Sequence, residues 1–307
     1  MPRYPLDRRE RSEPEKSINI LQMARNNDFN SYKHGMPMNR APFCGVFADK
    51  KCMFVFENCE IKYEFRNMHG LRWFLPGSGW QEEYYECYAS SADNLYFLFH
   101  EKKDAVPPAS RAFAIDLDNN QVTMLSCVVG GCEDNLNSDI DITAHFGYID
   151  FYDGKQPPKD RHHYTTEMVR KVVMWRVNTW CLIHYYTSRQ YFTNQVLIGE
   201  NGLVASEPAR HIKLRDNVYL FHWREMTAGG GMGTDIMDFN RFRGVGMFYG
   251  VGGGGKCING FQREDGKFLS LEDLALFEKV FEEKGERAAM EAMGVDLSER
   301  TVDLIYV

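Results

Sequence analysis

Apolar and polar residues alternate through the first half of the chain with the two-residue period of β-strands, whose successive side chains point to opposite faces. Residues 61–65 (IKYEF) are the clearest case and are typical of a half-buried strand. Asn and Gly residues lie near the turns between the expected strands, which cover 53–56, 61–65, 71–74, 83–88, 95–99, 112–117 and 122–128. About seven antiparallel strands are enough to close a small barrel.

The second half repeats this spacing and ends in a helix. Its expected strands cover 174–183, 184–186, 191–198, 209–214, 218–223, 235–239 and 245–249. Ser270, with Asp273 three residues later, is a capping-box signature, and apolar residues then recur at helical spacing up to Gly285. We expect this helix to cover the open end or the outer wall of a barrel.

A repeated segment links the two halves. Residues 93–101 (DNLYFLFHE) resemble residues 216–225 (DNVYLFHWRE), and a second apolar strand follows each copy. The two copies of the repeat can be aligned in either of two registers. Alignment on Asp-Asn pairs Glu101 with Arg224, whereas alignment on the final Glu pairs Glu101 with Glu225. The choice matters because a slip of one residue exchanges the inner and outer faces of a strand.

The repeat and the length of 307 residues predict an all-β protein of two tandem antiparallel barrels with a C-terminal helix. We expect an N-terminal arm with a short helix at 1–40, a first barrel at 41–150, and a second barrel with the C-terminal helix at 160–307. The polar, turn-rich stretch 130–158 is interpreted as the boundary or linker between the barrels.

The composition narrows the class of protein. The chain is 44% hydrophobic and 14% aromatic, with a mean hydropathy of −0.45, which is typical of a soluble globular protein with aromatic-lined interiors. A net charge of −7 leaves no broad basic surface for nucleic acid. The N-terminus lacks the apolar core of a secretory signal, and no run is long enough to span a membrane, so we expect a cytoplasmic protein.

Neither a metal nor a cofactor is expected. The eight cysteines form no CxxC pair, so free thiols are favoured over a zinc site or disulfides. Adjacent residues on a strand point to opposite faces, so His162 and His163 are interpreted as solvated linker residues, and 139–141 as a surface turn. The glycines at 229–231 and 252–255 do not fit a phosphate loop and are interpreted as hairpin turns.

Polar residues at the ends of aromatic strands are the candidates for chemistry. Glu225 and Glu101 each end an apolar strand, and His184, Tyr186 and Arg189 follow one another nearby. A carboxylate at the mouth of an apolar barrel loses solvation, so its pKa rises and suits general acid/base catalysis near neutral pH. Tyr and His side chains can orient a ligand by hydrogen bonds.

Residues 218–249 resemble the corresponding run of phenolic acid decarboxylases, small lipocalin-like barrels that need no cofactor. The matching stretches are 218–219, 223–225 with Thr227, 230–235 and 244–249, and residues 54–58 with 63–64 are similar to that family's opening hairpin. With two such units in one chain, the sequence is more similar to the MoaF-like group, named after molybdenum cofactor biosynthesis protein F. The resemblance covers roughly residues 41–262 and implies two lipocalin-like (calycin) domains.

The resemblance also implies roles for single residues. The decarboxylase's acidic Glu falls on Glu225 in the second domain and on Glu101 in the first. Its two tyrosines fall on His184 and Tyr186 in the second domain but on Phe54 and Phe56 in the first, and its Arg falls near Gly79 and Gly202, where this chain has no match. The resemblance therefore implies that the second barrel is the working one and that the first is chemically blunted.

We therefore expect a cofactor-independent lyase, isomerase or cyclase acting on a small aromatic or polyketide-like molecule. Glu225 is the expected general acid/base and Arg189 the expected anion clamp. Tyr186 and His184 would orient the ligand or relay protons, and three aromatic residues would line the pocket: Tyr219, Phe221 and Trp223. The alternatives are a carrier or sensor of a hydrophobic molecule without proton chemistry, and a first barrel that serves as a partner-binding or homodimer surface.

Overall fold

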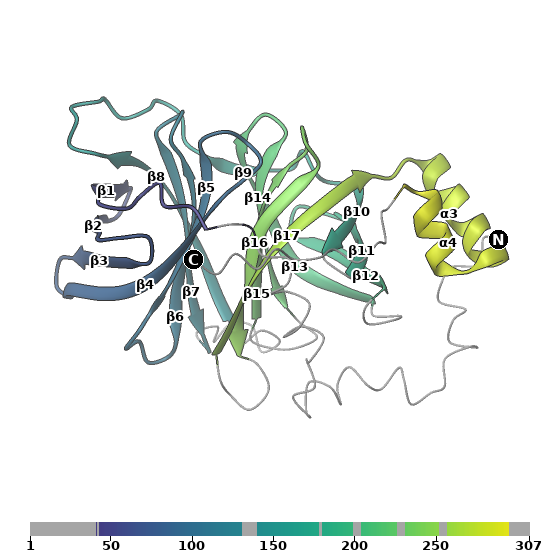
Figure 1. Ribbon diagram of the computed structural model, residues 1–307, viewed down its shortest axis with the longest axis horizontal. Helices are drawn as coiled ribbons and strands as arrows, with labels where there is room; N and C mark the ends of the chain where they lie inside the picture. The colour runs from purple at the N-terminus through teal and green to yellow at the C-terminus, as the bar shows by residue number, and fades with distance from the viewer. Residues whose placement is uncertain are drawn as a thin grey trace.

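The computed structural model describes residues 41, 43–130, 140–177, 180–198, 204–225, 231–251 and 257–294. Two antiparallel β-sheets lie side by side, and two helices lie at the far end of the second sheet (Figure 1). The predicted all-β class, the two tandem barrels and the C-terminal helix are confirmed. The short helix expected within 1–40 lies outside the described residues.

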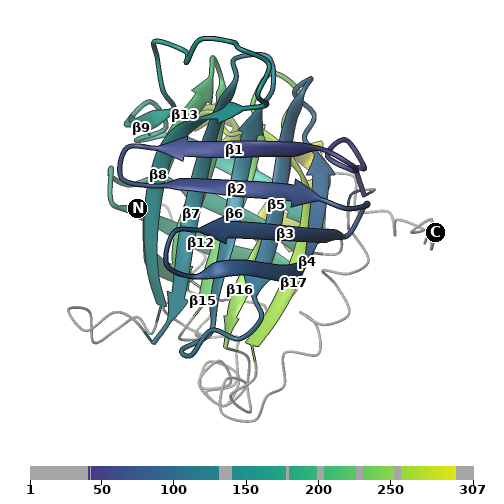
Figure 2. The same ribbon diagram turned by 90° about the vertical axis from the view of Figure 1, so that its left-hand side faces the viewer.

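The first sheet is a closed barrel of eight strands in sequence order. They are β1 (Lys51–Phe56), β2 (Glu60–Phe65), β3 (Gly70–Leu75), β4 (Gly79–Ala89), β5 (Leu95–Lys102), β6 (Ala109–Asp116), β7 (Gln121–Val129) and β8 (Ile140–Asp150). β8 pairs with β1 and closes the ring, so the interpretation of 130–158 as a linker is wrong for 140–150. β1–β3 cross in front of β5–β8, which places the two halves of the barrel in two layers (Figure 2).

Strand β4 connects these two layers. Its first half, from Gly79 to Tyr84, pairs with β3, and its second half, from Tyr85 to Ala89, pairs with β5. The two halves therefore have different partners, and β4 leaves β5 beyond the pair Tyr85–His100. A gap in the wall of the barrel begins at that pair.

The second sheet has nine strands: β9 (His163–Thr165), β10 (Val172–Val177), β11 (Trp180–Tyr185), β12 (Tyr191–Ile198), β13 (Val204–Arg215), β14 (Val218–Glu225), β15 (Gly231–Asp238), β16 (Arg243–Val251) and β17 (Cys257–Phe268). From β10 to β17 each strand pairs with the next, and β17 pairs with β10. The sheet therefore curls around an interior, as the first sheet does. Strand β9 pairs with the C-terminal half of β13.

Two helices, α3 (Leu271–Lys284) and α4 (Glu286–Ala292), follow β17. The predicted capping box is present: the Ser270 hydroxyl accepts from the Asp273 backbone N–H at 3.0 Å, and the Asp273 carboxylate accepts from the Ser270 N–H at 2.9 Å. Phe277 packs with Met174 and Ile183. These side chains lie on the outer face of β10 and β11, so the helix covers the outer wall of the barrel.

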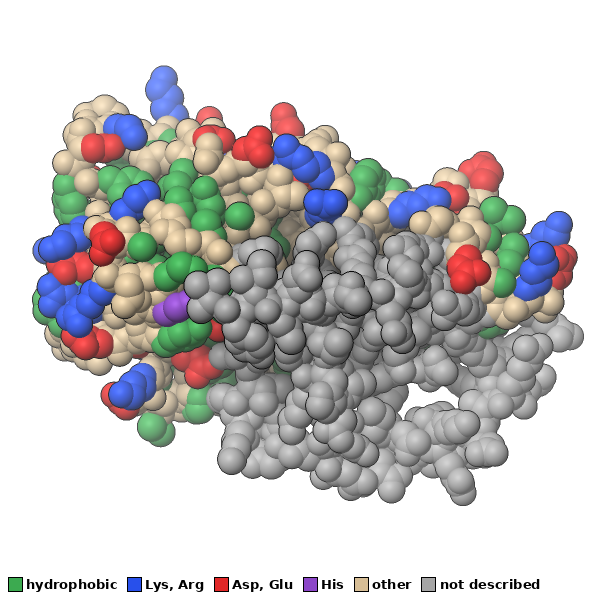
Figure 3. Space-filling model, in the orientation of Figure 1, with side chains coloured by type: hydrophobic (Ala, Val, Ile, Leu, Met, Phe, Trp, Pro, Cys, Tyr) green, Lys and Arg blue, Asp and Glu red, His purple; other side chains and the backbone are tan. Residues whose placement is uncertain are grey.

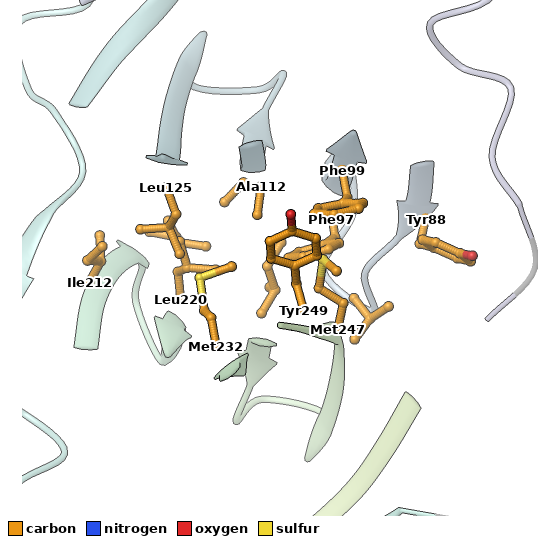
Figure 4. Close-up of a cluster of buried hydrophobic side chains, with 14 of the residues drawn as sticks. Tyr88, Phe97, Phe99, Ala112, Leu125, Ile212, Leu220, Met232, Met247 and Tyr249 are labelled. Atoms are coloured by element: carbon orange, nitrogen blue, oxygen red, sulfur yellow. The ribbon is translucent and has the colours of Figure 1, made fainter. Parts of the chain in front are cut away.

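The two barrels share one apolar core. Phe97, Ala112 and Leu125 come from the first barrel, and they pack with Leu220, Met247 and other residues of β13–β16 (Figure 4). The same strands carry inward-facing side chains on their other face. Because the strands at the contact between the two sheets bury both of their faces, the two barrels form one packed body rather than two separate domains joined by a linker.

Two equivalent aspartates lie beside this shared core. Arg215 of the second barrel donates to the fully buried Asp116 of the first, with Nε–Oδ2 and Nη2–Oδ1 distances of 2.8 and 2.6 Å. The Asp238 carboxylate of the second barrel accepts from the Ser91 hydroxyl of the first barrel at 2.8 Å, and it lies 3.5 Å from Arg241 in its own turn. Each aspartate therefore accepts a hydrogen bond from the other barrel.

The interpretation of His162 as a solvated linker residue is wrong. His162 is buried, and its Nδ1 lies 2.8 Å from the Thr123 hydroxyl while its Nε2 lies 3.9 Å from the Asp116 carboxylate. His163 is exposed, as expected.

Acidic and basic side chains intermingle on the visible surface (Figure 3). None of the described helices is long and apolar enough to cross a membrane.

Candidate functional site

The turn residues Asn94 and Asn217 decide between the two registers. Both have positive φ, of 53° and 58°, and the residue after each pairs with an equivalent aspartate, Asp116 or Asp238. The alignment on Asp-Asn is therefore correct, and Glu101 corresponds to Arg224. On β5 it is His100 that faces the barrel interior, so placing the decarboxylase carboxylate on Glu101 is wrong.

The interior of the first barrel contains a chain of three hydrogen-bonding side chains. The Glu83 carboxylate contacts Nδ1 of His100, and Nε2 of His100 lies 3.0 Å from the Tyr63 hydroxyl. All three side chains are at least 96% buried. Nδ1 faces only acceptors, the carboxylate and the Glu101 carbonyl, so it carries the ring proton. Nε2 is then the acceptor, and the Tyr63 hydroxyl donates to it.

Arg111 completes this network from the neighbouring strand, where it pairs directly with His100. Its Nη1 donates to the Tyr63 hydroxyl oxygen at 3.2 Å, and its guanidinium lies 4.1 Å from the centre of the Trp73 ring. Lys102 lies over the same ring at 5.8 Å. Among the described residues, neither cation forms an ion pair with a carboxylate, although Arg111 is 94% buried.

The protonation states follow from this arrangement. Burial raises the pKa of Glu83, but the His100 hydrogen bond, with Trp73 and Arg111 nearby, outweighs it and the pKa is lowered. Burial lowers the pKa of His100. Burial also raises the pKa of Tyr63 to about 12, against the opposing effect of Arg111. At neutral pH the network therefore holds an ionised Glu83, a neutral His100 and a neutral Tyr63.

The network can be reached from solvent on the side where β4 leaves β5. A groove of about 760 Å³ is lined there by Glu83 and His100 together with residues of β3–β5 and of the segments that follow β2 and β5. These residues include Arg66, Glu82, Tyr84, Glu101 and Lys103. The gap in the sheet thus exposes one edge of a buried acid/base pair to a groove large enough for a small molecule.

The sequence-predicted residues of the second barrel also face one interior. His184 and Tyr186 are buried, with ring centres 6.0 Å apart, and they pack against Phe221. Burial lowers the pKa of His184 to about 3. The Tyr186 hydroxyl accepts from the Trp175 indole at 3.3 Å and lies 3.4 Å from the Met237 sulfur.

The other residues predicted for the site differ in burial and in the direction of their side chains. Tyr219, Phe221 and Trp223 are buried in the same interior, as expected for a wall. The Tyr219 hydroxyl points toward the surface and donates to Glu167 at 2.7 Å. Glu225 is half-buried and alternates with these aromatic residues, so it lies on the inner face of β14. Arg189 is exposed in the turn before β12.

The sequence reasoning missed the network in the first barrel. The conclusion that the first barrel is chemically blunted came from Phe54 and Phe56 alone, and these residues line its apolar interior. A signal was available, because Tyr63, Glu83 and His100 each occupy the inward phase of an alternating strand. Within the described residues, no group of three His, Cys, Asp or Glu side chains is arranged to hold a metal ion.

The comparisons with known proteins concern mainly the second barrel. Residues 162–269 match the family model "MoaF C-terminal domain". A solved structure described as "a putative beta-lactamase from Burkholderia vietnamiensis" matches 34% of this chain and 97% of that chain, with 11% identity and a TM-score of 0.29, a level at which the likeness carries no argument. The search of curated proteins found no match.

Proposed function

We propose, for a chain whose residues 162–269 match the MoaF C-terminal domain model, that the first barrel binds a small aromatic carboxylate and transfers a proton on it. The proposed class is a cofactor-independent lyase or isomerase. The observation that carries the proposal is the pair of cations on Trp73. Arg111 and Lys102 both lie over this ring and form no ion pair with any described carboxylate.

A buried arginine without a carboxylate partner is costly unless a ligand supplies the anion. The guanidinium has five N–H donors in a planar fork, and the bond to Tyr63 uses one of them. A ligand carboxylate can accept two of the others. The Trp73 ring beside it offers an apolar face for an aromatic ligand, so charge and shape favour the same class of molecule.

The proton chemistry follows from the chain of Tyr63, His100 and Glu83. His100 accepts the phenol proton at Nε2, and the Glu83 carboxylate stabilises the imidazolium that forms. The tyrosinate, held by Arg111, then takes a proton from the carbon next to the ligand's carbonyl or carboxyl group. Return of that proton to another atom completes an isomerisation with no oxidant, reductant or cofactor.

Binding is tested by titrating the full chain with 4-hydroxycinnamate or benzoate and following tryptophan fluorescence. Arg111→Met should weaken binding about 10- to 100-fold, since a hydrogen bond to a charged group contributes about 1.5–3 kcal/mol. Arg72→Met is the matched control, because Arg72 lies on the outer face of the same barrel, does not line the groove, and is paired with Glu64 at 2.6 Å. Equal affinities for the wild type and Arg111→Met would contradict the proposal.

Catalysis is tested by hydrogen–deuterium exchange at the α-carbon of an arylpyruvate, measured by NMR. Tyr63→Phe should abolish the exchange and change binding by less than about threefold, because the lost hydroxyl acts on the proton and not on the carboxylate. The rival function is a non-catalytic carrier or sensor. It predicts binding that depends on Arg111, without catalysed exchange in either the wild type or Tyr63→Phe.

A further inference from the structure

The interior of the second barrel combines an aromatic wall with polar groups that lack partners. Phe221 and Trp223 stack with an interplanar angle of 24°, and Phe192 contacts Phe221 edge-on with ring centres 5.0 Å apart. His211 stacks on Phe221 at 4.7 Å, and His184 contacts Phe192 at 4.9 Å. Two imidazoles are therefore built into a cluster that is otherwise apolar.

Among the described residues, Nδ1 of His184 and Nε2 of His211 have no hydrogen-bond partner. The two residues are 96% and 94% buried. A third polar group is poorly satisfied: the Tyr186 hydroxyl faces only the Met237 sulfur as an acceptor, and a thioether is a weak one. Buried polar groups without partners are rare in native proteins and point to a missing ligand or water.

Two glycines in the wall let large aromatic rings approach the sheet closely. A Cβ at Gly233 would overlap the Trp223 ring, and a Cβ at Gly266 would overlap the Trp175 ring. The two indoles therefore lie flat against the sheet, in the space where a larger residue would stand.

The charges of this interior differ from those of the first barrel. Glu207, Asp235 and Glu264 are all at least 98% buried and lie on the inward phase of β13, β15 and β17. Glu264 and Asp235 also raise the pKa of Tyr186, after burial as the main cause. Burial lowers the pKa of both His184 and His211 to about 3, so neither imidazole supplies a positive charge for an anion at neutral pH, whereas neutral imidazoles can accept from and donate to an uncharged hydroxyl group.

We propose that the second barrel is a separate binding site for a neutral hydroxylated aromatic molecule, such as a phenol or naphthol, held by His184 and His211. The ring of the ligand packs on the aromatic wall, and its hydroxyl group donates to one imidazole. This site takes an uncharged ligand, while the first barrel takes an anion. The two barrels therefore bind ligands of different charge.

The test uses the full chain, with 2-naphthol as the neutral probe and 2-naphthoate as the anionic one. His184→Phe and His211→Phe should each weaken 2-naphthol binding at least fivefold, because the ring is kept and only the hydrogen bond is lost. Both variants should leave 2-naphthoate binding unchanged. His222→Phe is the matched control, since His222 is an equally buried histidine on the opposite face of β14.

Folding is checked without ligand by urea unfolding. His184→Phe and His211→Phe should be at least as stable as the wild type, because each removes a buried nitrogen without a partner. The proposal is overturned if the wild type does not bind 2-naphthol, or if His222→Phe weakens binding as much as the other two. Loss of 2-naphthol binding in Arg111→Met would also overturn it, by moving the neutral ligand to the first barrel.

Discussion

Arg215 joins the two barrels, and its removal tests how strongly they are held together. Its two bonds to Asp116 neutralise a carboxylate that is fully buried, while Asn119 donates two further bonds to the same group. Arg215→Met keeps much of the aliphatic stem and removes the charge. Breaking a buried ion pair costs about 3–5 kcal/mol. We expect the lower end, about 3 kcal/mol, because Arg215 is 20% exposed and the Asn119 bonds remain.

Arg241 supplies the internal control for this prediction. It lies beside Asp238, the aspartate equivalent to Asp116, but it is 48% exposed and lies 3.5 Å from both Asp93 and Asp238. Exposed ion pairs of this kind contribute about 0–1 kcal/mol. We therefore expect Arg241→Met to lower the free energy of unfolding by less than about 1 kcal/mol.

The assay is urea unfolding, followed by tryptophan fluorescence and circular dichroism, at several pH values. Burial raises the pKa of Asp116, but the nearby His162 and the hydrogen bonds from Arg215 and Asn119 outweigh it and hold the pKa well below its usual range. Because the pKa of this carboxyl is lower in the folded state than in the unfolded state, ionised Asp116 stabilises the fold at pH values above the unfolded pKa of about 3.9. This stabilisation is lost as the pH falls toward the folded-state pKa. The difference between wild type and Arg215→Met should therefore shrink below about pH 4.

Two results would refute this reasoning. One is an Arg215→Met variant that is no less stable than Arg241→Met at neutral pH. The other is a stability difference that stays constant from pH 7 to pH 3. Either result would mean that the shared apolar core alone holds the barrels together and that the buried pair contributes little net stability.

Three further predictions follow from single residues. A hydrogen bond from the Cys87 thiol lowers the pKa of Cys44 to about 6, so iodoacetamide should label Cys44 with a midpoint near pH 6. The buried Cys52, whose pKa is raised, should react only on unfolding. Peptide mass spectrometry distinguishes the two labelled cysteines. Gly246→Ala should cost about 3 kcal/mol in urea unfolding, because its Cβ would overlap the Thr234 carbonyl. Gly45→Ala should cost under about 0.5 kcal/mol, because its Cβ would make only an ordinary van der Waals contact with the Met68 side chain. Glu83→Gln should slow α-carbon exchange at least 100-fold, whereas Glu60→Gln, at an exposed position of β2 away from the groove, should leave the rate within twofold.

Local patterns were enough to predict the secondary structure. The two-residue period located most strands, and the repeat at 93–101 and 216–225 indicated two related sheets. The capping box at Ser270 and Asp273 marked the helix start, because its two hydrogen bonds join residues only three positions apart. Strand β8 was missed although residues 140–148 alternate apolar and polar side chains, because the aspartates and prolines of 130–158 led to its interpretation as a linker; β8 pairs with β1 and β7.

The sequence by itself determined the strands, their spacing and the duplication, since each depends on neighbouring residues. The tertiary structure alone decided which face of each strand points inward and which distant residues meet. Tyr63 lies 37 positions from His100 and 48 from Arg111, and only closure of the barrel brings these side chains together. One residue of register separates the inward-facing His100 from the outward-facing Glu101, and that choice is made by strand pairing rather than by local sequence.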